Sequence, residues 1–198
     1  MYLYNATIAG TYSSSYVSAA IYSEGSLTIV NTGTSTVTNT NDATNLNNVY
    51  GICVASALDI QGTGTLTATS GTGGTSYNCG IRVGTGGNYF TINGPTVKAF
   101  AGIAGSGGKS YGVCVGNINY SYCVKLIKGT LETHGNDSAA YCGPLSDFAE
   151  YGIDYFITNG SSKIDTITAG TSYDGTSVTS VPQDETYRNY KYITVTIP

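Results

Sequence analysis

The sequence predicts an all-β fold, a right-handed single-stranded parallel β-helix that forms one domain over residues 1–198. Three observations predict it. Thr, Val, Ile and Tyr are abundant while helix-forming residues are scarce, as in β-sheet proteins. Three short segments recur in the same order about every 30 residues, which is typical of a solenoid. Each segment alternates apolar and polar side chains, as half-buried strands do. Three strands per repeat imply one coil per repeat, and about five to six coils in all.

The first strand of each coil is expected around a repeated glycine. The segment contains Gly, then Ile or Val, then any residue, then Val, and it is found at 51–54, 80–83 and 112–115. Residues 20–22 are a weaker earlier copy, and residues 142–145 are a degraded later copy. Because side chains at i and i+2 share a face of a strand, the two aliphatic residues after the glycine are expected to point inward.

The second and third strands are expected to build two further inward columns. The second segment is found at 27–29, 58–60, 90–92 and 124–126, and the third at 36–38, 65–67, 96–98 and 130–132. The second strand then contributes Ile29, Ile60, Ile92 and Leu126, and the third contributes Val37, Leu66, Val97 and Leu131. Successive coils stack about 4.8 Å apart, so each coil buries the aliphatic side chains of its neighbours.

Turns and the two ends of the chain complete the predicted architecture. Gly, Asn and Ser gather between the segments, where positive φ is needed at sharp corners. Regular coils are expected over 1–135, and an irregular last coil with a C-terminal capping strand over 136–198. Residues 190–197 alternate as such a strand would. The first ten residues lack the features of a signal peptide, and the repeat is already present near Tyr4, so the chain is expected to be a fragment of a larger protein.

Composition argues against several classes of function. Only 10% of residues are charged and the net charge is -4, so nothing in the sequence forms the basic patch that nucleic-acid binding requires. No apolar run reaches the ~20 residues of a membrane span. Five cysteines and one histidine lack the spacing of a zinc site.

The cysteines occupy related positions in the repeat. Cys53 and Cys114 share one position two coils apart, with Arg82 between them, at about 9.6 Å, too far for a disulfide. Cys79 and Cys142 both precede a repeat glycine. We expect free, buried or half-buried thiols. Pairing of Cys114 with Cys142, or of Cys123 with a loop cysteine, stays open.

Tyrosine is the most abundant aromatic residue, with 18 copies against four Phe. Tyr50, Tyr77, Tyr111 and Tyr141 come just before the first strand of successive coils. Stacked at one corner, they would form an aromatic ladder that binds the apolar faces of sugar rings. The alternative is a structural ladder, since Tyr also packs well in sheets.

An acidic concentration at Asp147, Glu150 and Asp154 is the candidate calcium site, because Ca²⁺ prefers several oxygen ligands. A solvated loop is the alternative, and no other cofactor is expected.

No catalytic residues are expected. The carboxylates of Asp42, Asp59, Glu132 and Asp137 fall in different coils or strands, and glycoside hydrolysis needs a close pair. His134 is expected in a surface loop. The outward threonines at 36, 65, 96 and 130 are similar to the arrays of ice-binding solenoids, but Lys98 and Glu132 interrupt the neighbouring column.

The repeats resemble those of a known group of proteins. The run SLTIVNTGTSTVTNTN and the later VYGICVASALDIQGTGTLTATSG are similar to β-helical repeats in surface and secreted proteins of anaerobic, often gut-dwelling bacteria. Those repeats are in turn similar to polysaccharide-lyase-like, carbohydrate-binding β-helices. The resemblance covers roughly residues 2–135.

This resemblance implies a non-catalytic protein at the bacterial cell surface or outside the cell, which binds polysaccharide or host glycan as an adhesin does. The alternatives are a structural stalk without a ligand, a polysaccharide lyase or hydrolase, and a phage tailspike fragment, which would be a trimer.

Overall fold

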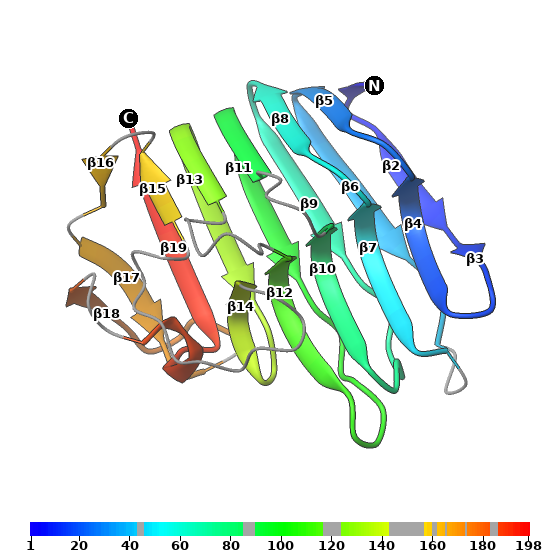
Figure 1. The fold of residues 1–198 in the computed structure, drawn as a ribbon. Helices are drawn as coiled ribbons and strands as arrows, with labels where there is room; N and C mark the ends of the chain where they lie inside the picture. Colours follow the sequence, from blue (N-terminus) through cyan, green and yellow to red (C-terminus); the bar gives the residue numbers. More distant parts are fainter. Residues whose placement is uncertain are drawn as a thin grey trace.

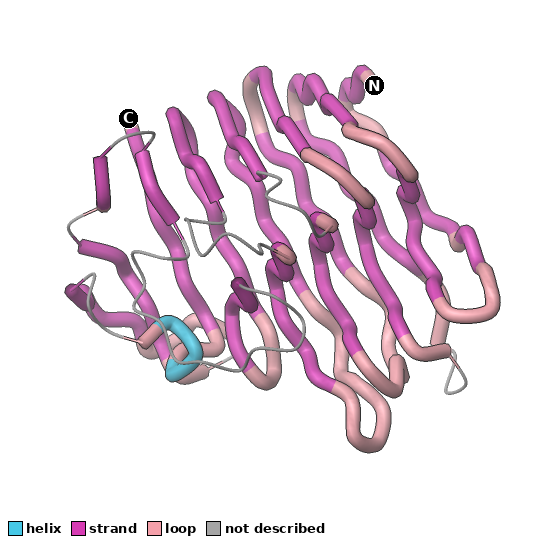
Figure 2. Tube along the Cα trace, viewed as in Figure 1, coloured by secondary structure: helices cyan, strands magenta, loops and turns pink. Residues whose placement is uncertain are grey.

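The protein is an all-β solenoid of parallel strands with about four turns (Figure 1). The computed structural model describes residues 1–42, 46–84, 90–116, 124–142, 157–159, 162–164, 166–172, 174–182 and 186–198. The parallel solenoid that the repeat predicts is thereby confirmed. Figure 2 shows that loops lie at the corners between strands, and that the loop between the strands β11 and β12 extends furthest from the stack.

One face of the solenoid is a six-stranded sheet built on the repeated glycine segment. Five of its strands are parallel: β4 (Val17–Ser23), β7 (Asn48–Val54), β10 (Tyr77–Val83), β12 (Lys109–Val115) and β14 (Ser138–Cys142). The short strand β3 (Tyr12–Ser13) folds back antiparallel on β4 and covers the N-terminal edge of this sheet. The six-stranded sheet carries the candidate site.

The other two faces of the solenoid belong to one 13-stranded sheet. The first face comprises β1 (Tyr2–Tyr4), β5 (Leu27–Thr32), β8 (Leu58–Gly62), the first halves of β11 (Phe90–Phe100) and β13 (Val124–His134), and β15 (Ile157–Asn159). The second face comprises β2 (Thr7–Gly10), β6 (Thr34–Asn39), β9 (Thr65–Thr69) and the second halves of β11 and β13.

Stacked glycines form the corner between these two faces. Gly62, Gly94 and Gly129 have φ of 105°, 114° and 103°, a conformation that costs other residues free energy. A Cβ built on Gly94 would meet the carbonyl oxygen of Gly62, and one on Gly129 would meet the backbone of Gly94. The corner therefore needs glycine both for its backbone conformation and for the close approach of successive coils.

The core consists of inward columns, and two of them match the predictions from the sequence. Ile29, Ile60, Ile92 and Leu126 are in register and fully buried. Ile52, Ile81 and Val113 form the second confirmed column. At about 25 cal/mol per Å² of apolar surface, such columns are the main favourable contribution to folding.

The predicted column of the third strand is wrong at its first member. Val37 pairs with Ala68, and Ser35 is the residue opposite Leu66. Gly33 stacks against Gly64 at the corner, which brings Thr34 opposite Thr65 and shifts the strand by two residues. A shift of two keeps the same side chains inward, so Val37 is still fully buried.

The degraded last copy of the glycine segment is also misplaced by the sequence. Ala140 lies opposite Val113, Tyr141 opposite Cys114 and Cys142 opposite Val115. Residues 139–142 are therefore the equivalents of 112–115. Ala139 stands where glycine was expected, so the repeat was not recognisable there.

The C-terminal part of the chain covers the edge of the last regular coil. β19 (Tyr192–Ile197) pairs antiparallel with the second half of β13, and β17 (Thr166–Gly170) pairs with both β19 and β18 (Val178–Pro182). The strand β16 (Ser162–Lys163) pairs with β15, and a short 3₁₀ turn, η2 (Tyr187–Asn189), precedes β19. Pairing with β19 satisfies backbone groups of β13 that an open edge would expose.

Candidate functional site

The four tyrosines proposed as a ladder lie on the outward face of the six-stranded sheet, but not at one repeat position. Tyr50 and Tyr111 share a column with Cys79 between them. Tyr77 lies two residues earlier, beside Asn48, while Tyr141 lies beside Cys114. Three of the rings nevertheless form a diagonal stack. The ring centroids of Tyr77 and Tyr111 are 6.2 Å apart, and those of Tyr111 and Tyr141 are 5.4 Å apart.

Three of the four tyrosines are inaccessible to solvent. Tyr50, Tyr111 and Tyr141 are buried, and Tyr77 is half-buried. Together with Ala19 and three cysteines they form an apolar cluster separate from the solenoid core. Burial raises the pKa of both Tyr50 and Tyr111. Tyr50, Tyr111 and Tyr141 are thus enclosed within the cluster, whereas Tyr77 keeps part of its surface exposed and lines a second hollow of about 270 Å³.

Three free cysteines surround one arginine within that cluster. Cys53, Arg82 and Cys114 lie in register on successive strands, as the sequence predicts. Cys53, Cys79 and Cys114 are free and buried. The expected equivalence of Cys79 and Cys142 is wrong, because Cys142 lies opposite Val115 while Cys79 lies opposite Tyr111. Cys123 lies outside the described residues.

The thiols differ in their ionisation. A hydrogen bond from Cys79 lowers the pKa of the Cys114 thiol, burial opposes this, and the positive charge of Arg82 lowers it further. Burial raises the pKa of Cys79, and it raises the pKa of Cys53 to about 11. At neutral pH Cys53 is therefore an uncharged thiol, and Cys114 is the thiol nearest to ionisation.

Burial alone would lower the pKa of Arg82, but the neighbouring Cys114, Tyr50 and Cys79 raise it above its usual value, so the guanidinium is always charged. It donates from Nη1 to the carbonyl oxygen of Val83. Among the residues that the structure describes, no Asp or Glu forms an ion pair with it.

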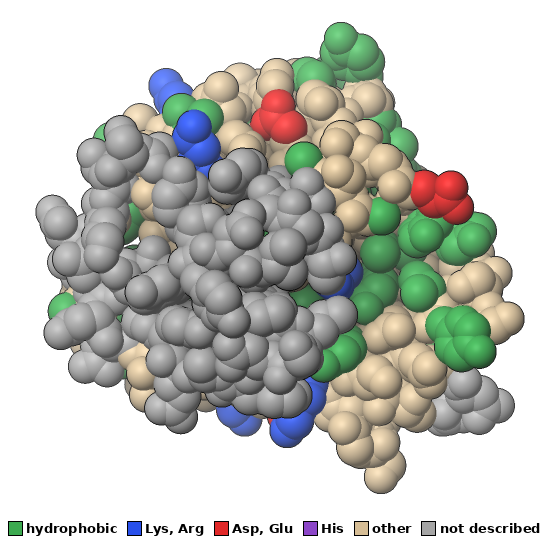
Figure 3. Space-filling model, viewed as in Figure 1, with side chains coloured by type: hydrophobic (Ala, Val, Ile, Leu, Met, Phe, Trp, Pro, Cys, Tyr) green, Lys and Arg blue, Asp and Glu red, His purple; other side chains and the backbone are tan. Residues whose placement is uncertain are grey.

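A hollow of about 290 Å³ opens beside this cluster toward solvent. Tyr22 and Val17 come from β4, Tyr50 and Cys53 from β7, and Arg82 from β10. Val54, Ala55 and Gly84 complete the lining. Figure 3 shows hydrophobic side chains gathered on this face, with a basic group at the border of the patch.

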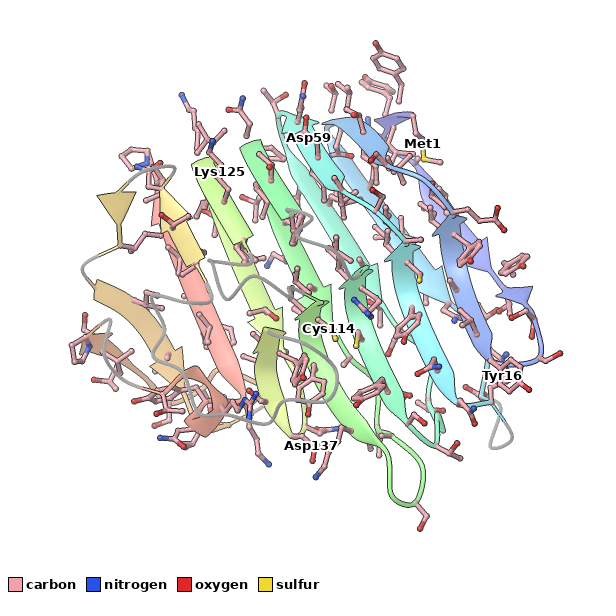
Figure 4. The ribbon with its side chains drawn as sticks, in the orientation of Figure 1. Met1, Tyr16, Asp59, Cys114, Lys125 and Asp137 are labelled. Atoms are coloured by element: carbon pink, nitrogen blue, oxygen red, sulfur yellow. The ribbon has the colours of Figure 1, made fainter. Side chains whose placement is uncertain are left out.

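The exposed aromatic pair at the rim was not predicted from the sequence. The rings of Tyr12 and Tyr22 are stacked with centroids 4.8 Å apart and an interplanar angle of 10°. They are 47% and 37% exposed, unlike the buried tyrosines. Tyr16 at the hairpin between β3 and β4 is exposed too (Figure 4). Tyr22 occupies the outward repeat position of Cys53, a signal that was present in the sequence, but the partner Tyr12 is supplied by an antiparallel hairpin outside the repeat.

His134 is not in a surface loop, contrary to the prediction. It ends β13, is buried, and its ring lies 4.5 Å from both the Phe100 and the Tyr192 rings. Its Nε2 is 2.9 Å from Glu132 Oε1, and Lys98 Nζ is 2.8 Å from Glu132 Oε2. Hydrogen bonds from Lys98 and His134 outweigh partial burial and lower the pKa of Glu132. These contacts link β11, β13 and β19, because Lys98 lies on β11, Glu132 and His134 lie on β13, and the Tyr192 ring of β19 packs on His134.

The remaining candidate residues are dispersed. Thr91 separates Asp59 from Lys125, as the sequence predicts, and Figure 4 shows both near one corner. Asp137 is 3.3 Å from Lys109 at the opposite corner. The proposed calcium ligands Asp147, Glu150 and Asp154 lie outside the described residues. Within the described part of the chain, no His, Cys, Asp and Glu side chains group as a metal site would need.

Comparisons with known proteins leave the site to be interpreted on its own chemistry. The chain matches no protein-family model, no curated protein and no solved structure. Among the described residues, no helix has the length and apolar character needed to span a membrane.

Proposed function

We propose that this protein is a non-catalytic β-solenoid of a bacterial surface or secreted protein, and that it binds a polysaccharide or host glycan at the hollow beside Tyr22. The observation that carries the proposal is the exposed Tyr12–Tyr22 stack, whose Tyr22 ring lines that hollow. Aromatic faces contact the apolar C–H faces of sugar rings, and the tyrosine hydroxyls add hydrogen bonds at the wet edge.

The surroundings of the stack support this proposal. Apolar Val17 and Val54 line the hollow together with the polar groups of Tyr50, Cys53 and Arg82. A mostly apolar concave surface with a few convergent polar groups is typical of small-ligand sites. The described carboxylates Glu132 and Asp137 are engaged by Lys98 and Lys109, so they do not form the free acidic pair of a glycosidase.

Glycan-array screening and affinity electrophoresis of the whole chain test the proposal. A bound glycan should lose affinity about 2- to 12-fold when Tyr22→Ala removes one stacking ring, by the usual value of an aromatic contact. Tyr12→Ala should act similarly, whereas Tyr22→Phe keeps the ring and should retain most of the affinity.

Tyr2→Ala is the matched control, because Tyr2 is 85% exposed but belongs to the other sheet. Absence of binding across plant and host glycans would favour the structural stalk. Release of reducing or unsaturated sugars would instead establish a hydrolase or lyase.

We also infer that the coils wind in a right-handed sense, since parallel strands connected within one sheet almost always cross over that way. The full stack would contain five to six coils when the incomplete turns at both ends are counted. An experimental structure would decide both points.

A further inference from the structure

We propose that the hollow selects glycans that carry a negatively charged group, a carboxylate or a sulfate, and that Arg82 pairs with this group. The inference rests on the proposed function, because it names the class of glycan for the same site. It starts from the cost of the arginine itself. Arg82 is only 8% exposed, and withdrawing a charge from water is unfavourable unless an anion compensates for it.

Among the described residues, a thiol and a backbone carbonyl provide that compensation, and no carboxylate does. The carbonyl oxygen of Val83 accepts a hydrogen bond from Nη1, and the sulfur of Cys114 accepts another from the guanidinium. A guanidinium has five N–H donors in a planar fork that matches a carboxylate or a sulfate. These two partners do not fill the five-donor fork, so the described residues leave N–H groups of Arg82 for a ligand that enters the hollow.

The nearest anionic group lies on the side of Arg82 away from the hollow. Cys114 is one strand further along the stack and fully buried, while Cys53, on the other side of Arg82, lines the hollow. Because the pKa of Cys53 is raised to about 11, this thiol carries no negative charge at neutral pH. The wall that faces the ligand thus combines a fixed positive charge with neutral side chains.

Size and net charge favour a specific contact over general attraction. At about 290 Å³ the hollow is near the lower end of small-ligand sites, roughly 300 Å³, which suits one sugar residue with its acidic group. The whole chain has a net charge of -4, so its long-range field repels polyanions. Preference for an acidic glycan would have to come from the local contact with Arg82.

The test compares matched ligands that differ only in charge, by titration calorimetry on the whole chain. One arm uses a galacturonate trisaccharide against its methyl ester, and the other uses a sulfated dextran oligosaccharide against unsulfated dextran. We expect at least a 10-fold preference for the charged member of one pair, which identifies carboxylate or sulfate as the recognised group. Arg82→Met should abolish that preference, so that the charged and the neutral member of the pair bind the variant with equal affinity.

Two further variants separate charge from folding. Arg82→Lys keeps the charge but loses the planar fork, so it should retain only part of the preference. Cys53→Ser changes the hollow without changing its charge and should keep the full preference, and thermal unfolding checks that each variant is folded. Equal affinity for charged and neutral members, with binding still sensitive to Tyr22→Ala, would overturn this inference but leave the proposed function intact. Absence of binding to all four ligands and to the glycan panel would overturn both.

Discussion

Single residues give one repeat position different properties in successive coils. The outward position two residues after the repeat glycine holds Cys53, Arg82 and Cys114 in adjacent strands. The backbone hydrogen bonds of the stack do not depend on which side chain stands there, so this position is free to vary. The inward position before it must stay aliphatic, because it packs in the shared core.

Gly80 illustrates the opposite case, a residue that the packing of the coils requires. A Cβ added there would lie 2.8 Å from the carbonyl carbon of Ala99 and would collide with the Phe100 amide nitrogen. We expect Gly80→Ala to lower the free energy of unfolding by at least about 1–3 kcal/mol, measured by urea denaturation. The control is Gly25→Ala, where nothing lies within 4 Å and the change should stay within about 0.5 kcal/mol. Equal stability of the two variants would contradict the close approach of these strands.

Cys114 should make stability depend on pH. Its pKa is lowered in the folded protein from 9.0 to about 7, so its ionisation stabilises the fold at alkaline pH, and that contribution is lost as the pH falls through about 7. The free energy of unfolding should therefore rise between pH 7 and 9, by no more than about 2–3 kcal/mol.

Thiolate absorbance at 240 nm should show this group ionising before Cys53, whose pKa is raised by burial. Cys114→Ser removes the thiol, and Arg82→Met removes the neighbouring charge, so both should weaken the pH dependence. A first thiolate that forms only above about pH 9 would rule out this assignment.

At the scale of elements, β19 differs from every strand of the stack that it closes. It runs antiparallel to β13 and buries Ile193 and Val195 against the core. Its neighbour on the other side is β17, also antiparallel. The chain thus ends its parallel stacking with an element that the repeat does not contain.

Removing the buried side chain of Ile193 should destabilise this closure. We expect Ile193→Ala to cost about 2–5 kcal/mol in urea denaturation, because it leaves a cavity at a fully buried position. Loosening β19 also uncovers the edge of β13, so the variant should aggregate more readily in light-scattering measurements. Thr179 in β18 is exposed, so Thr179→Ala should change neither the free energy of unfolding nor the light scattering. If both variants behave like the unmodified chain, β19 does not close the stack.

At the scale of the whole molecule, stability should be graded along the solenoid. Each coil contacts only its neighbours, so a strand in the middle is held from both sides and a strand at the end from one. β7 and β10 are paired on both edges, whereas β1, β2 and β3 each have one described partner strand.

Hydrogen exchange measured by mass spectrometry should reveal this gradient. Amides of β7 and β10 are expected to exchange at least about 10-fold more slowly than those of β1 and β3, because terminal strands open locally at lower free energy. The central strands β8 and β9 provide the comparison on the other sheet, and they should be as protected as β7. Uniform exchange along the chain would indicate that the solenoid opens as a single unit.

Much of the fold could be predicted because its physical cause is local and repeated. Ile29, Ile60 and Ile92 stand out as aliphatic residues at equal spacing, and the structure stacks them as predicted. Prediction failed where the repeat changes chemistry. Ser35 is buried in the inward column of the third strand, opposite Leu66, but a serine was not recognised there as a core residue. Ala139 replaces the expected glycine in the last copy of the first segment. His134 was assigned to a loop because the sequence gives no sign that Phe100 and Tyr192 cover it.

The sequence by itself determined the parallel solenoid, two of its inward columns and the alignment of Cys53 and Cys114 about Arg82, because each follows from the period of the repeat and the two-residue alternation of a strand. Only the tertiary structure decided which tyrosines are buried and which form the rim of the hollow. Tyr12 meets Tyr22 through a hairpin, and Tyr77, Tyr111 and Tyr141 meet diagonally across three coils. Those contacts depend on the exact register of neighbouring strands and on what covers an outward face, and neither is encoded in the spacing of one strand's residues.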